Sequence, residues 1–261
     1  MHHRPKKRFG QNFLHDPVVI GKIVKVIAAK PGDHLVEIGP GQAALTIPLL
    51  QAVGEMDAIE IDRDLAPLIQ DACAPHGILH LHNVDALTFD IHELRRDQRP
   101  LRIVGNLPYN ISTPILFHLL DYRDDIQDMH FMLQKEVVER MAADPGSKTY
   151  GRLSVMLQAY CKVERLFDIG PGAFKPAPKV DSSIVRLTPL PEKVVGIADP
   201  QAFAELVRRA FSQRRKTLRN NLKGMLSGEQ IKALGVDPGV RPETLDVSAF
   251  KRLASATIKI P

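Results

Sequence analysis

The chain has 261 residues, of which 44% are hydrophobic and 25% are charged, which suffices for one sizeable core and a smaller second domain. Its two cysteines, Cys73 and Cys161, lie far apart and outside any C-x-x-C pair, so we predict no disulfide framework, no thiolate zinc site and no bound metal. The N-terminus lacks a secretory pattern, no apolar run approaches the roughly 18 residues that span a bilayer, and the net charge of +5 suits a polyanionic partner, so we expect a cytoplasmic protein without a membrane partner.

Apolar strand-like segments and amphipathic segments alternate along the first half of the chain. Asp16 and Pro17 are typical of a helix start, and the apolar residues after them keep helical spacing. Strands are then predicted at 35–39, 57–61, 78–83, 101–106 and 129–133, with helices at 43–50, 65–73 and 112–120 between them. This alternation is typical of a parallel sheet with helices on both faces, an α/β fold.

The second half of the chain changes character near Pro189. Before it, helices are predicted at 135–143 and 151–160 and strands at 163–169 and 183–187. Beyond Pro200 only helical periodicity is found. We therefore predict a first, α/β domain over residues 1–189, a linker near 189–199, and a small α-helical domain over residues 200–261.

The first predicted strand runs into a glycine-rich turn, Gly39-Pro40-Gly41, that opens into a helix. Glycines let a ligand approach the backbone closely, and ligands of open α/β sheets bind at the carboxyl ends of strands. The turn therefore predicts a site for a nucleotide-like cofactor, with a plain tight turn as the alternative. The full G-x-G-x-x-G dinucleotide pattern is absent, because Ala44 occupies the third glycine position.

Two acids follow the next two predicted strands. Glu60 lies about 20 residues past the glycines and suits a ribose diol, because a carboxylate accepts two hydroxyl hydrogen bonds. Asp85 follows the third strand, where it can accept a hydrogen bond from an adenine amine. Dehydrogenases that bind NAD share the turn and the first acid, so that class stays open here, although neither the third glycine nor a catalytic acid–base pair is evident.

The sequence Asn106-Leu107-Pro108-Tyr109 follows the fourth predicted strand. An asparagine amide oxygen accepts a hydrogen bond from an amino group, proline removes a backbone donor and fixes the turn, and tyrosine offers an aromatic face on which a base can stack. We predict that these residues grip an exocyclic amine and hold its nitrogen toward a methyl donor. Catalysis would come from positioning and from acceptors that stabilise the growing charge. The alternative is a β-turn with a buried tyrosine.

Five motifs occur in order, at residues 9–14 (FGQNFL), 37–41 (EIGPG), 106–109 (NLPY), 174–182 (FKPAPKVDS) and 214–222 (RRKTLRNNL). Together they resemble the KsgA-type ribosomal RNA adenine dimethyltransferases, and the resemblance runs from about residue 8 to the C-terminus. It implies a Rossmann-like methyltransferase domain with a small α-helical C-terminal domain, and S-adenosyl-L-methionine (SAM) as cofactor. It also implies dimethylation of the N6 amine of two adjacent adenines near the 3′ end of small-subunit (16S) rRNA, during ribosome biogenesis.

The resemblance assigns roles to single residues as well. The residues that it implies for cofactor binding are Asn12, Leu14, Gly39, Gly41, Glu60, Asp85 and Asn106. Asn106, Leu107, Pro108 and Tyr109 match the clamp on the target amine, and Phe174 resembles an aromatic residue that helps to hold the flipped adenine. Some relatives carry a further glycine in the cofactor loop, where this chain has Ala43 or Ala44.

Residues 207–223 contain seven basic side chains and no acid. The basic residues are Arg208, Arg209, Arg214, Arg215, Lys216, Arg219 and Lys223. Because these like charges repel one another and a bound polyanion would offset the repulsion, we predict that this run binds RNA phosphates, with a solvated helical face as the alternative. Residues 4–8, Lys175 and Lys179 would extend the surface. Base flipping is expected, because an amine in a stacked helix cannot be reached.

Two other readings of the same motifs stay open. A large-subunit rRNA adenine N6-methyltransferase of the macrolide-resistance type would share the cofactor loop and the clamp, but residues 178–182 and 214–222 favour the small-subunit enzyme. A non-catalytic ribosome-assembly factor could keep the fold, but the intact cofactor and clamp motifs argue against a loss of activity. We expect a monomer whose partner is the small ribosomal subunit.

Overall fold

The computed structural model describes residues 11–257, and the chain divides into two compact units. The first contains residues up to 138 and 164–189, and the second contains residues 139–163 and those from 190 onward. Residues 139–163 are thus grouped with the C-terminal helices, whereas the domain limits of 1–189 and 200–261 stay a prediction. Residues 4–8, which we expect to extend the RNA surface, lie outside the described residues.

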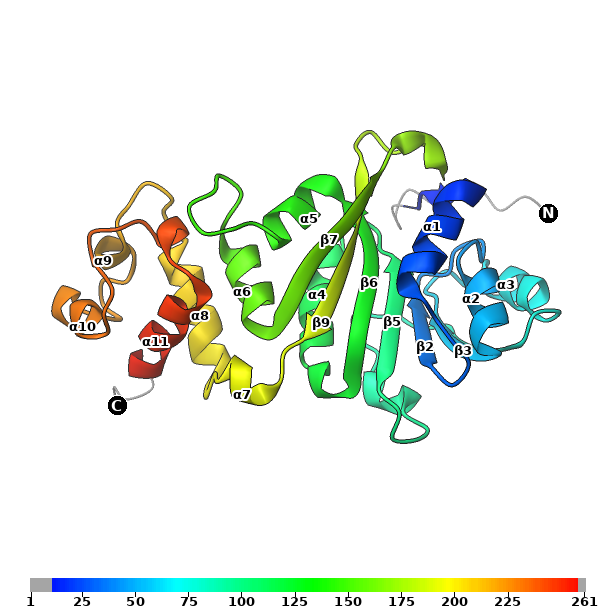
Figure 1. Ribbon diagram of the computed structural model, residues 1–261, viewed down its shortest axis with the longest axis horizontal. Coiled ribbons are helices and arrows are strands. Elements are labelled where there is room, and N and C mark those ends of the chain that lie inside the picture. Colours follow the sequence, from blue (N-terminus) through cyan, green and yellow to red (C-terminus); the bar gives the residue numbers. More distant parts are fainter. Residues whose placement is uncertain (1–10, 258–261) are drawn as a thin grey trace. The chain divides into compact units, whose positions relative to one another are not determined.

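The first unit is built on a seven-stranded sheet with the strand order β4-β3-β2-β5-β6-β9-β7 (Figure 1). Its strands are β2 (His34–Ile38), β3 (Glu55–Ile59), β4 (Ile78–His82), β5 (Leu101–Asn106), β6 (Ile126–Gln134), β7 (Cys161–Ile169) and β9 (Ser182–Pro189). The pairs from β4 to β6 are all parallel, which confirms the α/β prediction. β9, for whose direction the alternation of elements gave no prediction, pairs antiparallel with β6. The reason is that β9 follows β7 without a crossover helix, and a parallel return requires one.

Four helices lead into or connect the parallel strands of this sheet. They are α1 (Pro17–Ile27), α2 (Thr46–Val53), α3 (Ala66–Cys73) and α4 (Ser112–Leu120). Asp16 caps α1 as expected, because its carboxylate accepts hydrogen bonds from the amides of Val18 and Val19 at 2.8 and 3.1 Å. The helix predicted to start at residue 43 begins only at Thr46, because Ala43 adopts a φ of 63° that interrupts a right-handed helix.

Two very short strands form a second, antiparallel ladder. These are β1 (Phe13–Leu14) and β8 (Phe174–Lys175), with Leu14 opposite Phe174. The main-chain amide of His15 adds a hydrogen bond to the carbonyl of Ala173 at 3.0 Å. Strands of two residues carry no periodicity, so the sequence does not predict them. The ladder fastens the segment before α1 beside the carboxyl ends of the sheet strands.

A buried arginine lies at the opposite, amino ends of the strands. Arg102, at the start of β5, is 6% exposed. Its guanidinium donates hydrogen bonds to Asp33 at 2.6 Å, to Asp128 at 3.0 Å and to the carbonyl of Ile27 at 2.6 Å. These contacts join α1, β5 and β6, so Arg102 serves stability at the end of the sheet away from the glycine-rich turn.

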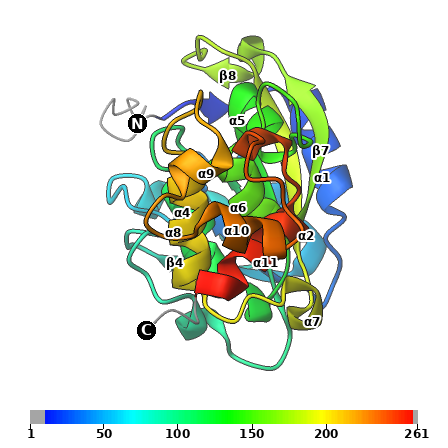
Figure 2. The ribbon, with the colours of Figure 1, turned by 90° about the vertical axis from the view of Figure 1, so that its left-hand side faces the viewer.

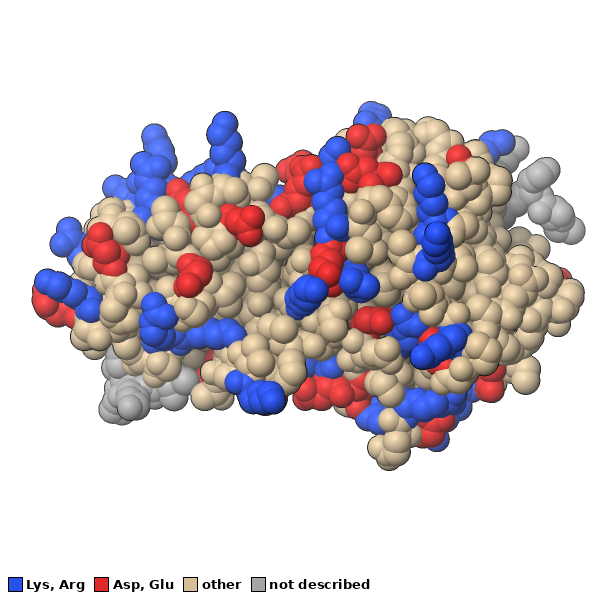
Figure 3. Space-filling view, viewed as in Figure 1, with Lys and Arg blue, Asp and Glu red and all other residues tan. Residues whose placement is uncertain are grey.

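The second unit is helical in the part that the structure describes (Figure 2). Its main helices are α6 (Arg152–Tyr160), α8 (Pro200–Ala210), α9 (Leu218–Asn221), α10 (Gly228–Ala233) and α11 (Val247–Thr257), with the short α7 (Glu192–Val195) before them; α5 (Lys135–Met141) spans the boundary between the units. Phe203 and Phe250 are fully buried in its core, and Phe250 stacks on Phe211 with ring centroids 5.6 Å apart. Long Lys and Arg side chains project from its surface (Figure 3). No helix within residues 11–257 is long and apolar enough to cross a bilayer.

Candidate active site

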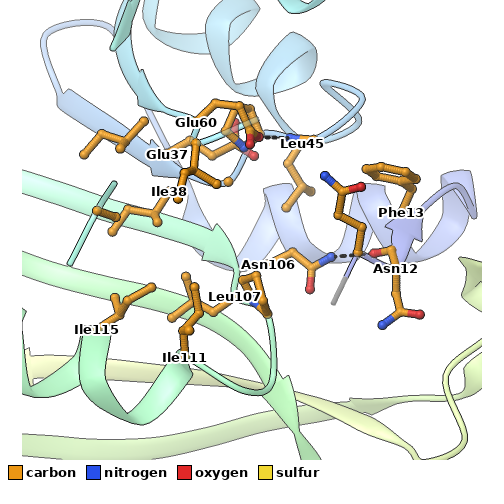
Figure 4. A pocket seen from close by; sticks show the side chains of 18 of the residues that line it. Asn12, Phe13, Glu37, Ile38, Leu45, Glu60, Asn106, Leu107, Ile111 and Ile115 are labelled. Carbon is orange, nitrogen blue, oxygen red and sulfur yellow. Dashed lines mark hydrogen bonds between the residues drawn. The ribbon is translucent and has the colours of Figure 1, made fainter. Parts of the chain in front are cut away.

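A pocket opens in the first unit at the carboxyl ends of β2, β3 and β5 (Figure 4). The chain leaves β2 toward β3 on one side of the sheet and returns to β5 on the other, so this is the point where the strand order reverses and where open α/β sheets bind ligands. The predicted residues that line it are Asn12, Leu14, Gly39, Gly41, Glu60, Asp85, Asn106, Leu107, Pro108 and Tyr109. Segments that lie up to 104 residues apart in the sequence (11 to 115) therefore meet in one cavity.

The glycine-rich turn needs glycine for two separate reasons. Gly39 and Gly41 have φ angles of 73° and 57°, in the left-handed region that favours glycine. In addition, a Cβ on Gly41 would lie 3.1 Å from the Phe13 ring, so the N-terminal segment lies directly against the turn. Ala43 takes the same kind of conformation, with a φ of 63°. The glycine motif therefore continues in backbone shape although the residue differs.

Glu60 is held by main-chain amides at the edge of the pocket. Its two carboxylate oxygens accept hydrogen bonds from the amides of Gly41 at 3.3 Å and Asp62 at 2.8 Å. Glu60 is 5% exposed, and this burial raises its pKa despite those hydrogen bonds. Asp85 accepts a hydrogen bond from the amide of Leu87 at 2.9 Å, which orients its carboxylate. Both acids thus have fixed positions in a site where a nucleoside would need acceptors.

A third acid, Glu37, lines the pocket and was not among the predicted site residues. It is 2% exposed, and burial raises its pKa to about 7, with the Thr46 hydroxyl opposing the rise and the charge of Glu60 adding to it. The sequence signal for it was a carboxylate inside an otherwise apolar strand end. A carboxylate at such a position must be neutralised or paired with another group, because an isolated buried charge is strongly unfavourable.

The loop after β5 is held at several points. The Asn106 side-chain amide donates a hydrogen bond to the carbonyl of Asn12 at 3.0 Å (Figure 4), which leaves its amide oxygen as an acceptor. The Leu107 amide donates to the carbonyl of Met132 at 3.3 Å. The Tyr109 hydroxyl lies 2.8 Å from the hydroxyl of the fully buried Ser182, and burial raises the pKa of the tyrosine. An aromatic ring beside an amide oxygen can receive a planar base that carries an amino group.

Phe174 has a different position from the other predicted residues. It is 3% exposed, belongs to β8, and packs in the core with Phe13 and Leu14. It is not one of the residues that line the pocket. Its predicted part in holding a flipped adenine stays a prediction.

The predicted RNA-binding residues fall into two groups in the second unit. Arg208 donates two hydrogen bonds of 2.6 Å to Glu205, an acid that lies just before the stretch that we counted as free of acids. Arg214 donates to the carbonyl of Lys148 at 3.1 Å. The second group is exposed and has neither a carboxylate partner nor a side-chain hydrogen bond within residues 11–257; it consists of Arg215, Lys216, Arg219 and Lys223. Their roles in RNA binding stay a prediction, and the second group is the better candidate.

Comparison with known proteins settles the family. The family model described as ribosomal RNA adenine dimethylase matches residues 2–259. The chain belongs to this family. This confirms the resemblance found in the sequence motifs and places the protein among the methyltransferase enzymes.

Relatives of the dimethylase family agree over nearly the whole chain. A protein of Pseudomonas syringae pv. tomato named ribosomal RNA small subunit methyltransferase A is 57% identical over 252 residues, which are 97% of this chain and 94% of that protein. The protein of the same name from Pseudomonas aeruginosa is 56% identical over 99% of this chain and 97% of its own length.

Two solved structures confirm the Rossmann-like methyltransferase fold. A dimethyladenosine transferase from Plasmodium falciparum is 27% identical with a TM-score of 0.80, covering 95% of this chain and 98% of that one. The 23S rRNA methyltransferase ErmE is 25% identical with a TM-score of 0.75, covering 95% of this chain and all of that one. One of these enzymes is named for dimethyladenosine and the other for 23S rRNA, so the shared fold does not by itself identify the RNA substrate.

Proposed function

We propose that this protein uses SAM to dimethylate the N6 amine of two adjacent adenines near the 3′ end of small-subunit (16S) rRNA, as a step in biogenesis of the small ribosomal subunit. The observation that carries the proposal is a pocket lined by carboxylates that opens directly beside the loop of Asn106 and Tyr109. A cofactor and a target base can therefore meet in one place. We also propose that the protein acts in the cytoplasm as a monomer.

The charge of the pocket favours SAM over a dinucleotide. Glu37, Glu60 and Asp85 line it, and no Lys, Arg or His is among its described lining residues. The diphosphate of NAD would meet carboxylates there without a compensating cation. SAM carries an ammonium and a sulfonium group and lacks phosphate, so its charge suits these residues. Glu60 and Asp85 would hold its ribose and its adenine. The main chain of the turn at Gly39 and Gly41 would approach the cofactor closely.

The clamp would act by positioning and by accepting hydrogen bonds. When bound, SAM supplies a methyl group on a sulfonium, which is an excellent leaving group. The Asn106 amide oxygen and the carbonyl of Leu107 would accept hydrogen bonds from the N6 amine of adenine. They would stabilise the positive charge that develops on that nitrogen and then take part in passing its proton to water. The Tyr109 ring would stack on the base, held by Ser182.

The choice of the small subunit rests on the names of the relatives that match over nearly their full length. The test is methyl transfer from labelled SAM to isolated unmethylated small and large ribosomal subunits, followed by digestion of the RNA to nucleosides. We expect label in N6,N6-dimethyladenosine from the small subunit alone. Label from the large subunit would contradict the substrate. A thermal shift with NADH but not with SAM would contradict the cofactor.

The exposed basic residues of the second unit offer a matched test of RNA binding. Arg215→Gln is expected to weaken binding to small subunits and to reduce the slope of log K against log salt by roughly 0.7–0.9, because one phosphate contact is lost. Arg208→Gln removes the same charge from a side chain already paired with Glu205, so a smaller change is expected. Filter binding of labelled subunits across a salt series measures both. Equal slopes for the two variants would argue against a phosphate contact at Arg215.

A further inference from the structure

Glu37 occupies a position in the pocket that the proposed reaction leaves without a role. It is the one acid of β2, whose other residues are His34, Leu35, Val36 and Ile38, and all five are buried. Figure 4 shows its side chain beside Glu60 at the base of the pocket. Its Oε2 atom is fully buried and has no hydrogen-bond partner within residues 11–257. An unpartnered buried carboxylate oxygen that borders a pocket is an acceptor for which the protein itself supplies no donor.

The groups packed around Glu37 do not offset a negative charge. From α2 comes the hydroxyl of Thr46, which lowers the pKa of Glu37 by less than burial raises it. From the end of β3 comes Glu60, which repels an ionised Glu37. From α3 comes Cys73, whose pKa is raised to about 11 by burial and by the charge of Glu37, so this thiol is neutral near pH 7. With no Lys, Arg or His among the described lining residues, burial governs Glu37 and raises its pKa to about 7.

We propose that Glu37 is a proton-linked acceptor for the positively charged part of the cofactor. At pH 6 the free protein carries a proton on Glu37 for most of the time, and it gives that proton to water when a cationic ligand binds. The ammonium of the amino-acid part of SAM supplies both the compensating charge and a hydrogen-bond donor, directly or through a water molecule. This inference rests on SAM as the cofactor, and it makes Glu37 a sensor of cofactor charge.

The linkage has a defined sign. Because the cationic ligand prefers the ionised form, only the ionised fraction of the protein binds it with full affinity. Affinity is therefore constant at pH values well above 7 and falls as the pH drops below that point. From pH 7 to pH 6 the expected loss is about fivefold, and at lower pH it approaches about tenfold per pH unit, the limit for the release of a single proton. By reciprocity, bound SAM lowers the pKa of Glu37.

Calorimetry of SAM binding without RNA tests this proposal. Titrations at pH 6 to 7 in buffers of different ionisation enthalpy count the protons released. This range also avoids the α-amino group of the ligand, which titrates near pH 8. We expect release of most of one proton at pH 6. We expect no release with 5′-methylthioadenosine, which keeps the nucleoside but is uncharged, because it has a thioether in place of the sulfonium and lacks the amino-acid part.

Two variants separate Glu37 from the other acids of the pocket. Glu37→Gln keeps the shape of the side chain and is expected to bind SAM without proton release and with an affinity independent of pH in this range. Asp85→Asn removes another pocket carboxylate, so it should weaken binding while proton release persists. If the wild-type protein bound SAM without releasing a proton, or if Glu37→Gln released as much, the inference would be overturned. If the wild-type protein did not bind SAM at all, the proposed function would fail with it.

Discussion

Replacing Tyr109 with alanine is expected to slow methyl transfer by roughly 10- to 100-fold while SAM binding is retained. The ring borders the pocket next to Asn106, and base–aromatic stacking contributes about 1–3 kcal/mol per base. Loss of the ring also lets the target nitrogen move, and small displacements in such reactions lower rates strongly. Single-turnover methylation of saturating small subunits measures the rate, and calorimetry measures SAM binding. A fully active Tyr109→Ala variant would refute the clamp.

Ser182 provides the matched control for this prediction. Tyr109→Phe keeps the ring but removes its 2.8 Å hydrogen bond to Ser182, and Ser182→Ala removes the same bond from the other side. One such bond contributes about 0.5–1.5 kcal/mol, so each variant should lose at most about tenfold in rate. If Ser182 acts only by positioning the ring, the double variant should be no slower than either single variant. Additive losses would show that Ser182 acts in another way.

Replacing Arg102 with methionine is expected to lower the free energy of unfolding by roughly 3–5 kcal/mol, the usual loss when one partner of a buried ion pair is removed. The substitution would leave the largely buried carboxylates of Asp33 and Asp128, which are 10% and 14% exposed, without their cation, and the carbonyl of Ile27 without its donor. Methionine replaces most of the volume of the arginine stem, so the loss reports the charge and the hydrogen bonds. Urea denaturation followed by circular dichroism measures it.

Arg99 is the control for Arg102. Its side chain is half exposed and pairs with Asp97 at 2.7 Å, close to the start of the same strand. Exposed pairs of this kind contribute little to stability, so Arg99→Met should unfold at nearly the same urea concentration as the wild-type protein. Similar unfolding curves for the Arg99 and Arg102 variants would show that the buried network does not stabilise the sheet. The folded Arg102→Met protein should still bind SAM, because Arg102 lies at the amino ends of the strands.

The sequence alone determined the α/β fold, the family and most of the pocket. The physical reason is that most of the predicted cofactor residues lie at or shortly after the end of a sheet strand, as Gly39, Glu60 and Asp85 do. The carboxyl ends of neighbouring parallel strands meet at one edge of a sheet, so their positions in space follow once the alternation of elements is recognised. Asn106 and Tyr109 could be placed in the same pocket by the same argument, because they follow β5.

Only the tertiary structure decided what each of these side chains touches. The partner of Tyr109 is Ser182, 73 residues later, on the strand whose antiparallel direction the alternation did not predict. The Phe13 ring covers Gly41 because the two-residue ladder of β1 and β8 holds it there, and so short a ladder leaves no periodic pattern. The environment of Glu37 likewise depends on Thr46, Glu60 and Cys73 from three other segments. Strand ends are local features of a sequence, whereas hydrogen-bond partners and desolvation are properties of the packed chain.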